Sequence, residues 1–388
     1  MPMAIPMRLN TTNISGRLWW TRSVSAPRRA PALRAGWAGV GLLMAGLAMA
    51  TAGARAELPT PLTRPATVLR QPAKAALLGV AQAGERVVAV GERGTVLLSD
   101  DAGMRWRQAA SVPVSVTLTA VQFINQRVGW AVGHCGVVLR SDDGGEHWHR
   151  QLDGHAAAAL MLKDAQALGD EKAVAEAQRV VQEGADKPLL SLHFVDEREG
   201  WVVGAFNLAL VTHDGGQTWA SGSTRLPNPK AGHLYALHRE KDELLIAGEL
   251  GLLLHSADAG RHFERIEVPY AGSFFVVNRE PSGAWVVAGL RGHALRSLDQ
   301  GKTWTALASP VPVSFTSLLA EPSGGTWLAN QAGQIWKAEP HLNTLQPQAP
   351  SAAQQPASLL RLADGTLLLA GWNGISRVPA SPRSTTLR

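Results

Sequence analysis

Five aspartates recur at one position of a repeated turn motif, and carboxylates are the groups with which a hydrolase could act. A glycosidase needs two carboxyl groups at a suitable separation. An Asp in a turn, however, also accepts bonds from nearby backbone N–H groups, and the glycine of the motif permits a positive φ. Because turn chemistry explains all five, we predict structural roles and no catalytic residue. The motif, [ST]-x-D-x-G-x-x-[WF], contains Asp101, Asp143, Asp214, Asp258 and Asp299 and closes on Trp106, Trp148, Trp219, Phe263 and Trp304.

Other residues that could support hydrolysis are scattered. A sialidase uses a Tyr nucleophile beside an arginine cluster, and the sequence has only Tyr235 and Tyr270. Among other carboxylates, Glu92, Glu249 and Glu321 are not marked as a pair by their spacing. A glycan-binding or glycan-hydrolysing propeller is therefore kept as the alternative function.

Metal and thiol chemistry have equally few candidates. His147 and His149 could begin a metal site, but no third ligand is evident, so no metal is expected. Cys135, the only cysteine, cannot form an internal disulfide, and we expect it to be buried and inert. The Gly-rich turns lack the strand-to-helix context of a nucleotide loop, so we expect no cofactor.

The motif belongs to a longer repeat. Five segments align in phase, at 87–106, 129–148, 200–219, 244–263 and 285–304, and two weaker copies without the acidic turn follow at 327–337 and 367–377. A spacing near 42 residues is that of a four-stranded propeller blade. The sequence therefore predicts an all-β, seven-bladed β-propeller over residues 57–380.

One interval, between Trp148 and Trp219, is 71 residues long. The excess lies at 155–186, a segment rich in Ala, Leu, Glu and Gln with apolar residues at helical spacing, which predicts a helical insertion between blades 2 and 3. The last repeat ends after its third strand, and we expect Ala66 to Arg70 to supply the missing outer strand. Residues 381–388 are expected to be a disordered tail.

The first 56 residues differ from the rest. They contain seven Arg and no Asp, Glu or Lys, followed by an apolar run that closes on Ala54-Arg55-Ala56. This pattern predicts a signal peptide cleaved after Ala56 and a periplasmic or otherwise exported protein, with a retained membrane anchor as the alternative. The remainder has 30 basic and 31 acidic residues, so the net charge of +6 is no evidence for nucleic acid binding.

Propeller topology predicts where a partner would bind. The five acidic turns join the third and fourth strands of their blades (C–D turns). The turns that join the second and third strands (B–C turns) lie on the opposite face, with the insertion. Exposed arginines and aromatics are common interface anchors, so Arg93, Phe206, Arg291 and Trp372 of the B–C turns are the expected contact residues. We expect a monomer that binds a protein partner.

The acidic motif is the Asp-box, or BNR repeat, which occurs in proteins of several functions. The pattern G-W-x-V-G before a strand and [ST]-x-D-G-G-x-x-W after it, at 129–148 and 200–219, resembles the photosystem II assembly/stability factor family and specifically its bacterial relatives, as does GADKPLL at 184–190. The likeness spans residues 75–378. It implies a non-catalytic extracytoplasmic assembly factor, with a membrane complex as the candidate partner; the helical insertion departs from the photosynthetic members.

Overall fold

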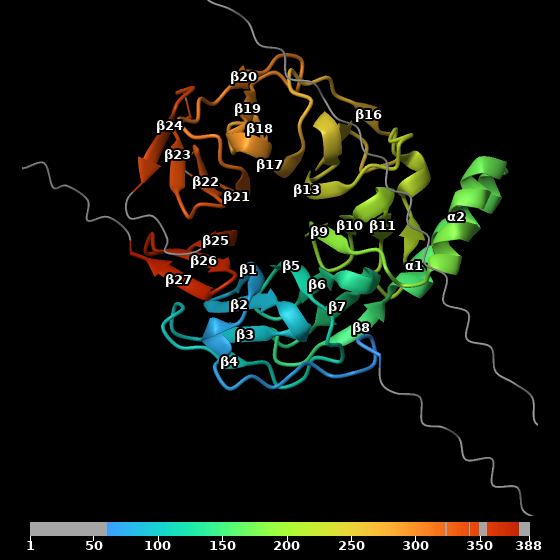
Figure 1. The fold of residues 1–388 in the computed structure, drawn as a ribbon, viewed down its shortest axis with the longest axis horizontal. Coiled ribbons are helices and arrows are strands. Elements are labelled where there is room, and N and C mark those ends of the chain that lie inside the picture. The colour runs from blue at the N-terminus through green and yellow to red at the C-terminus, as the bar shows by residue number, and fades with distance from the viewer. Residues whose placement is uncertain (1–59, 323, 341, 349–354, 380–388) are drawn as a thin grey trace, which may run out of the picture. The chain divides into compact units, whose positions relative to one another are not determined.

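A computed structural model describes residues 60–322, 324–340, 342–348 and 355–379. These residues form seven antiparallel sheets arranged as a ring around a central axis, which confirms the predicted seven-bladed propeller (Figure 1). In each sheet the strands follow chain order from the axis outward. The expected signal peptide (1–56) and C-terminal tail (381–388) lie outside the described residues.

Six sheets have four strands and the seventh has three. The first four, from inner to outer strand, are β1 (Leu77–Ala83), β2 (Arg86–Gly91), β3 (Val96–Ser99) and β4 (Arg107–Gln108); β5 (Leu118–Phe123), β6 (Gly129–Gly133), β7 (Val138–Ser141) and β8 (His149–Leu152); β9 (Leu189–Phe194), β10 (Gly200–Gly204), β11 (Ala209–Thr212) and β12 (Ala220–Ser221); β13 (Leu234–Glu240), β14 (Glu243–Gly248), β15 (Leu253–Ser256) and β16 (Glu264–Arg265). The others are β17 (Phe274–Arg279), β18 (Trp285–Gly289), β19 (Ala294–Ser297) and β20 (Thr305–Ala306); β21 (Phe315–Ala320), β22 (Thr326–Asn330), β23 (Ile335–Ala338) and β24 (Leu345–Gln348); β25 (Pro356–Arg361), β26 (Leu367–Gly371) and β27 (Gly374–Val378).

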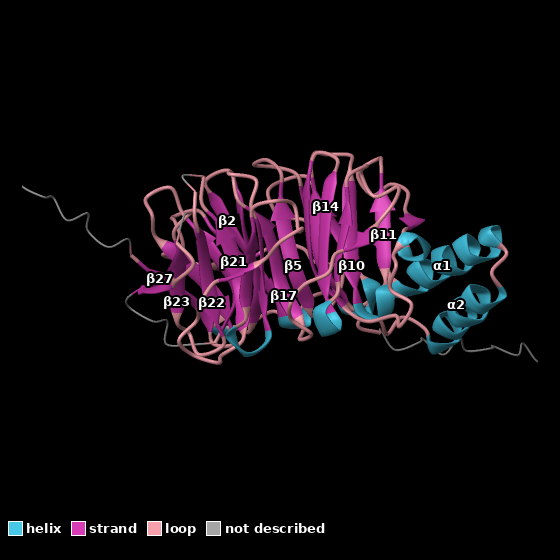
Figure 2. Ribbon diagram, turned by 90° about the horizontal axis from the view of Figure 1, so that it is seen from above, coloured by secondary structure: helices cyan, strands magenta, loops and turns pink. Residues whose placement is uncertain are grey.

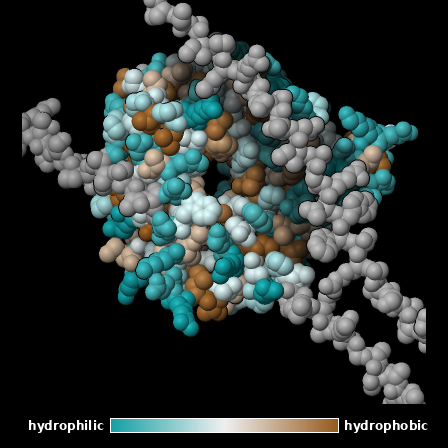
Figure 3. All heavy atoms as spheres, viewed as in Figure 1, coloured by the Kyte–Doolittle hydropathy of each residue, from teal (hydrophilic) through white to brown (hydrophobic). Residues whose placement is uncertain are grey.

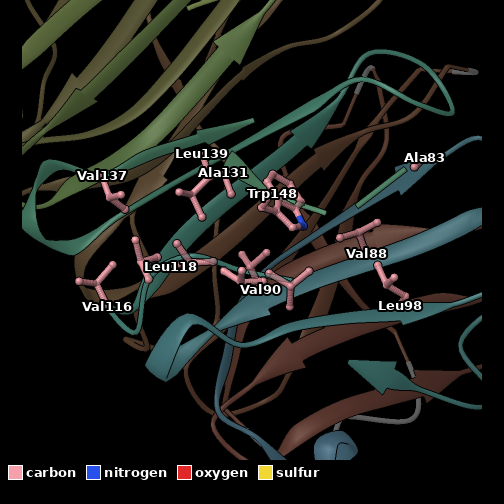
Figure 4. Close-up of a cluster of buried hydrophobic side chains, with 13 residues drawn as sticks. Ala83, Val88, Val90, Leu98, Val116, Leu118, Ala131, Val137, Leu139 and Trp148 are labelled. Atoms are coloured by element: carbon pink, nitrogen blue, oxygen red, sulfur yellow. The ribbon is translucent and has the colours of Figure 1, made fainter. Parts of the chain in front are cut away.

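The second strand of each blade is almost continuously apolar because neighbouring blades cover both of its faces. All five residues of β10 are buried, for example. A strand covered on both faces loses the alternation of apolar and polar residues that a half-exposed strand shows. Figure 4 shows the packing between blades 1 and 2, where Val88, Val90 and Leu98 meet Leu118 and Leu139.

The Gly-Trp pair that opens the second strand has a packing reason. A Cβ on Gly200 would lie 2.3 Å from the ring of Phe194, so only glycine lets that ring lie against the strand. Trp130 of the preceding blade stacks on the other face of the same ring, with centroids 3.7 Å apart and planes 6° apart. The motif thus places an aromatic ring between two blades.

The helical insertion consists of α1 (Gly154–Leu168) and α2 (Glu171–Glu183), capped by the side chains of Asp153 and Asp170. The two helices lie at the outer rim of the ring, beside blade 3 (Figures 1 and 2). The hydroxyl of Thr224 donates to Asp164 at 2.5 Å and ties α1 to that blade. None of the helices in the described part of the chain combines the length and apolar composition needed to cross a membrane.

The expectation that Ala66 to Arg70 completes the last blade is wrong. This segment forms no strand and lies against blade 1 and the connection from blade 1 to blade 2, where Ala66 N–H donates to Val112 O at 3.0 Å and Thr67 N–H to Arg93 O at 3.3 Å. The carbonyls of Val112 and Arg93 offer partners in an irregular region, which draws the segment away from β27.

The ring closes instead through side chains. Leu368 and Ala370 of β26 pack against Val87 and Leu97 of blade 1. The backbone N–H of Val80 donates to the hydroxyl of Ser358 at 3.3 Å. Apolar packing between blades 7 and 1 therefore replaces a strand shared between the two ends of the propeller.

If packing closes the ring, the last interface should be as strong as an internal one. Leu368→Ala is expected to lower the free energy of unfolding by about 2–5 kcal/mol, the range for truncating a buried leucine. Leu245→Ala, the corresponding position of β14, is the matched control because both side chains are at most 2% exposed. Denaturant unfolding compares them, and a much smaller loss for Leu368→Ala would show that the closure contributes little.

Candidate functional site

The two faces of the ring have different chemistry. The Asp-box turns gather on one face with many charged side chains, whereas the B–C turns lie on the other. The B–C turns of blades 1 to 5 each contain a short helical turn. In the side view, short helical turns lie along the lower edge of the ring (Figure 2).

Each Asp-box is a closed hydrogen-bond unit. The Asp carboxylate accepts from the backbone N–H four residues later, at 2.8–3.0 Å in all five boxes. The Ser or Thr hydroxyl donates to that carboxylate and accepts from the N–H of the glycine four residues later, at 2.7–2.9 Å. These bonds use the carboxylates within the turns themselves.

The boxes also join neighbouring blades. The carbonyl of Gly215, in the box of blade 3, accepts from three side chains of blade 2: Trp130 Nε1 at 3.3 Å, Arg140 Nη1 at 2.9 Å and Gln151 Nε2 at 2.8 Å. Arg377 of the last blade donates in the same way to Ala102 O in the first box, at 3.3 Å. These contacts give the acidic face a structural function.

The hydrogen bonds change the acidity of the box aspartates. Side-chain donation from Arg105, followed by its backbone N–H, lowers the pKa of Asp101 to about 2. Donation from the hydroxyl and N–H of Thr303 lowers the pKa of Asp299 to about 2 as well. The folded state therefore stabilises the ionised carboxylates.

This shift predicts acid sensitivity. Because the folded pKa lies below the unfolded value of about 3.9, the contribution of Asp299 to stability is present above pH 4 and is lost as the pH falls toward 2. Asp299→Asn should remove part of the decrease in unfolding free energy between pH 4 and pH 2, measured by denaturant titration. Asp242→Asn, outside the boxes, is the control; an unchanged pH profile for Asp299→Asn would contradict the assignment.

On the opposite face, the B–C turns of blades 1 to 5 share one left-handed backbone position. In blade 1, Arg93 (φ 56°, ψ 34°) and Gly94 (φ 71°) are the central pair of a turn with positive φ at both residues, which suits a two-residue hairpin. Arg93 thus occupies a left-handed position although it is not a glycine. The same left-handed position is occupied by Cys135, Phe206, Leu250 and Arg291 in blades 2 to 5.

The four expected contact residues come from blades 1, 3, 5 and 7. Arg93 and Arg291 are exposed, Phe206 is 48% exposed and Trp372 is 56% exposed. Of the four, Trp372 alone lines the pocket at the axis. Arg93, Phe206 and Arg291 lie on the turns around this pocket. The four residues therefore lie on one face but do not form a single cluster.

The axial pocket is formed by the inner strands. Each inner strand begins with a buried residue and bulges at the next one, whose side chain lines the pocket. The cavity has a volume of about 370 Å³, and Figure 3 shows the ring hollowed at its centre. The bulged residues are Leu78, Thr119, Leu190, Tyr235, Phe275, Thr316 and Ala357; Gln331, Gln355, Pro356 and Trp372 complete the lining.

Glycine at the end of the second strand accompanies this bulge. A Cβ on Gly204 would lie 2.1 Å from the carbonyl oxygen of Pro188, just before β9. The missing side chain lets Ala205 N–H donate to that carbonyl at 3.0 Å. Six second strands end in glycine, and the exception is β22, which ends in Asn330.

Aromatic rings connect the rim of this face to the pocket. The rings of Phe206 and His233 meet edge to face, with centroids 4.6 Å apart. The centroid of the His233 ring lies 5.9 Å from that of Tyr235, which in turn lies 5.2 Å from that of Phe275. The Lys187 ammonium lies 4.9 Å from the centroid of the Phe206 ring.

The sequence analysis did not identify the bulged residues that line the pocket. The repeat contains a signal for them, because each follows the first buried residue of an inner strand.

The remaining candidates show no catalytic grouping. Glu321 is buried and paired with Lys337 and Arg361, both at 3.4 Å, while a carboxylate oxygen of Glu249 accepts from His233 N–H at 3.1 Å. Among the described residues, the lining of the axial pocket contains no Asp, Glu, Lys or Arg. A pair of carboxylates for glycoside hydrolysis is therefore missing from that lining.

Cys135 and the two histidines also form no grouped site. Cys135 is half-buried, and its burial, with the nearby Asp186 and Asp153, raises the pKa of the thiol and disfavours the reactive thiolate. His147 instead bonds Asp143 of its own box at 2.8 Å. Within the described ranges, no three His, Cys, Asp or Glu side chains form a group that could hold a metal ion.

Parts of the chain are similar to known sequences. Residues 171–329 match the family model described as photosynthesis system II assembly factor YCF48. Over 77 residues, the chain is 36% identical to the photosystem II assembly lipoprotein Ycf48 of Synechococcus sp. (strain CC9902); the match covers 20% of this chain and 23% of that relative's length.

Comparison with solved structures supports the fold. A structure described as YCF48 bound to D1 peptide has a TM-score of 0.61 and 17% identity, covering 82% of this chain and all of that one. YCF48 from Cyanidioschyzon merolae has a TM-score of 0.59 and 13% identity, covering 80% of this chain and 97% of that one. The WD40 propeller domain of Doa1 has a TM-score of 0.56 and 12% identity, covering 84% and 97%.

Proposed function

We propose that this photosystem II assembly factor-like propeller is a non-catalytic, extracytoplasmic binding factor that engages a protein partner, with a membrane complex as the candidate, through its B–C face. The similarity to YCF48 supports assembly by protein binding. One structurally related YCF48 is described as bound to a D1 peptide, which supports a peptide segment as the recognised element. The lipoprotein name of the cyanobacterial relative supports export.

The contrast between the two faces carries the choice of surface. On the Asp-box face, carboxylates and arginines are engaged in turns and in links between blades. On the B–C face, Phe206, Leu250 and Trp372 are 48–64% exposed, and Arg93 and Arg291 are exposed between them. Aromatic and arginine side chains are typical anchors of protein interfaces.

The helical insertion adds to this face. The α1 helix begins two residues after β8 and contacts the B–C turn of blade 2. The stem of the insertion therefore stands beside the B–C turn of blade 2. A partner that covers the B–C face of blades 2 and 3 would meet it.

Charge reversal tests the surface. The double variant Arg93→Glu/Arg291→Glu should reduce capture of partner proteins from a detergent-solubilised membrane fraction by about tenfold, because loss of two anchors costs at least about 1.4 kcal/mol of binding free energy. Capture on immobilised full-length protein, followed by quantitative mass spectrometry, measures the loss.

Lys302→Glu provides the matched control, since this exposed lysine lies in an Asp-box turn on the opposite face. Its captured proteins should equal those of the unmodified chain. Equal capture by the double variant, or loss only with Lys302→Glu, would assign binding to another surface. Turnover of aryl glycosides by the purified chain would instead favour the hydrolase alternative.

A further inference from the structure

The axial pocket continues into the ring. Beyond the first cavity of about 370 Å³ lies a second of about 220 Å³, lined by the following residues of the same inner strands. The bulged residues line both cavities, so the two spaces are successive parts of one channel that opens beside Trp372. We call the outer cavity the axial socket.

The axial socket is electrically neutral. Across the described residues, neither cavity is lined by any Asp, Glu, Lys, Arg or His. A charged group entering here would lose its hydration without gaining an opposite charge, which is strongly unfavourable. The socket therefore favours an uncharged group of a ligand.

Its polar atoms suit a peptide backbone. The hydroxyls of Thr119 and Thr316 donate to Leu189 O at 2.7 Å and Pro356 O at 2.6 Å, so their protons are already engaged. The side-chain amides of Gln331 and Gln355 each offer a carbonyl acceptor and an NH₂ donor. An extended peptide needs both, because its backbone presents an N–H and a C=O at each residue.

Tyr235 strengthens this match. Its phenol is a hydrogen-bond donor, and burial, followed by the carboxylate of Glu249, raises its pKa. Its ring contacts Phe275 on one side and lies near His233 on the other, continuing the aromatic path from Phe206. This path of rings leads from the rim to the socket at the axis.

Size limits what can enter. A cavity of about 370 Å³ lies at the low end of the range for ligand pockets, roughly 300–1,000 Å³. An α-helix is about 10–12 Å across with its side chains, so the cavity suits one or two side chains better than a folded element.

We propose that the axial socket receives an uncharged aromatic or aliphatic side chain of an extended partner segment, whose backbone bonds to Gln331 and Gln355. This inference rests on the proposed function and specifies the chemistry that the B–C face recognises. Apolar burial supplies the binding energy, and the neutral wall rejects segments that present a charge at that position.

A photo-crosslinking peptide tests the inference. The probe is an end-blocked nine-residue peptide of Gly and Ser with p-benzoylphenylalanine at its centre. Its adducts on the full-length protein should map to Tyr235, Phe275 and Trp372. Excess peptide with a central Phe should compete, and the same peptide with a central Asp should not. Adducts elsewhere, or equal competition by both peptides, would overturn the proposal.

Isosteric variants separate charge from shape. Leu190→Glu should lower the crosslinking yield about tenfold or more. Leu190→Gln has nearly the same side-chain shape without the charge, and its yield should stay within about threefold of that of the unmodified protein. If Leu190→Glu does not fold, Ala357→Glu and Ala357→Gln place the same pair at the bulge of blade 7. Thermal melting confirms folding, and equal yields from Glu and Gln variants would refute the neutral socket.

The arginine variants distinguish this inference from the proposed function. Arg93→Glu/Arg291→Glu should lose membrane-fraction capture yet crosslink the uncharged peptide normally, because neither arginine lines the socket. Capture lost with the arginines but retained in Leu190→Glu would refute the socket and keep the binding face. Capture retained in both would refute the face, and the socket with it.

Discussion

Burial of the second strands depends on closure of the ring. Strands such as β10 are apolar on both faces, so each sheet is stable only between two neighbours. The last sheet has three described strands and shares none with the first, so side-chain packing of β26 against blade 1 completes the ring. Every interface, and the diameter of the central channel, depends on this closure.

The Asp-boxes reinforce the same constraint. Because Gly215 O receives three side chains of the preceding blade and Ala102 O receives Arg377, the boxes hold adjacent sheets at a fixed distance along one edge. Their carboxylates are consumed by local bonds. A face occupied by such bonds has fewer free groups for a partner than the B–C face, where the turns need only their backbone geometry.

Much of this architecture could be predicted because the repeat records it. The five Asp-box repeats and the two copies without the acidic turn indicated the blade count, and the composition of 155–186 indicated the helical insertion. The position of Ala66 to Arg70 could not be predicted, since apolar character alone did not distinguish an outer strand from a segment bonded to Val112 and Arg93. The axial pocket was missed because its seven bulged residues differ in type, from Ala357 to Phe275, and share only a position.

That shared position links local geometry to the proposed recognition. A glycine such as Gly204 brings the end of the second strand against the start of the first, and the inner strand bulges there toward the axis. Side chains at this position line the axis, where the seven blades place residues of different size and type. In this chain they are all uncharged. The fold supplies the ring of positions, and the residues placed there determine what the axis can bind.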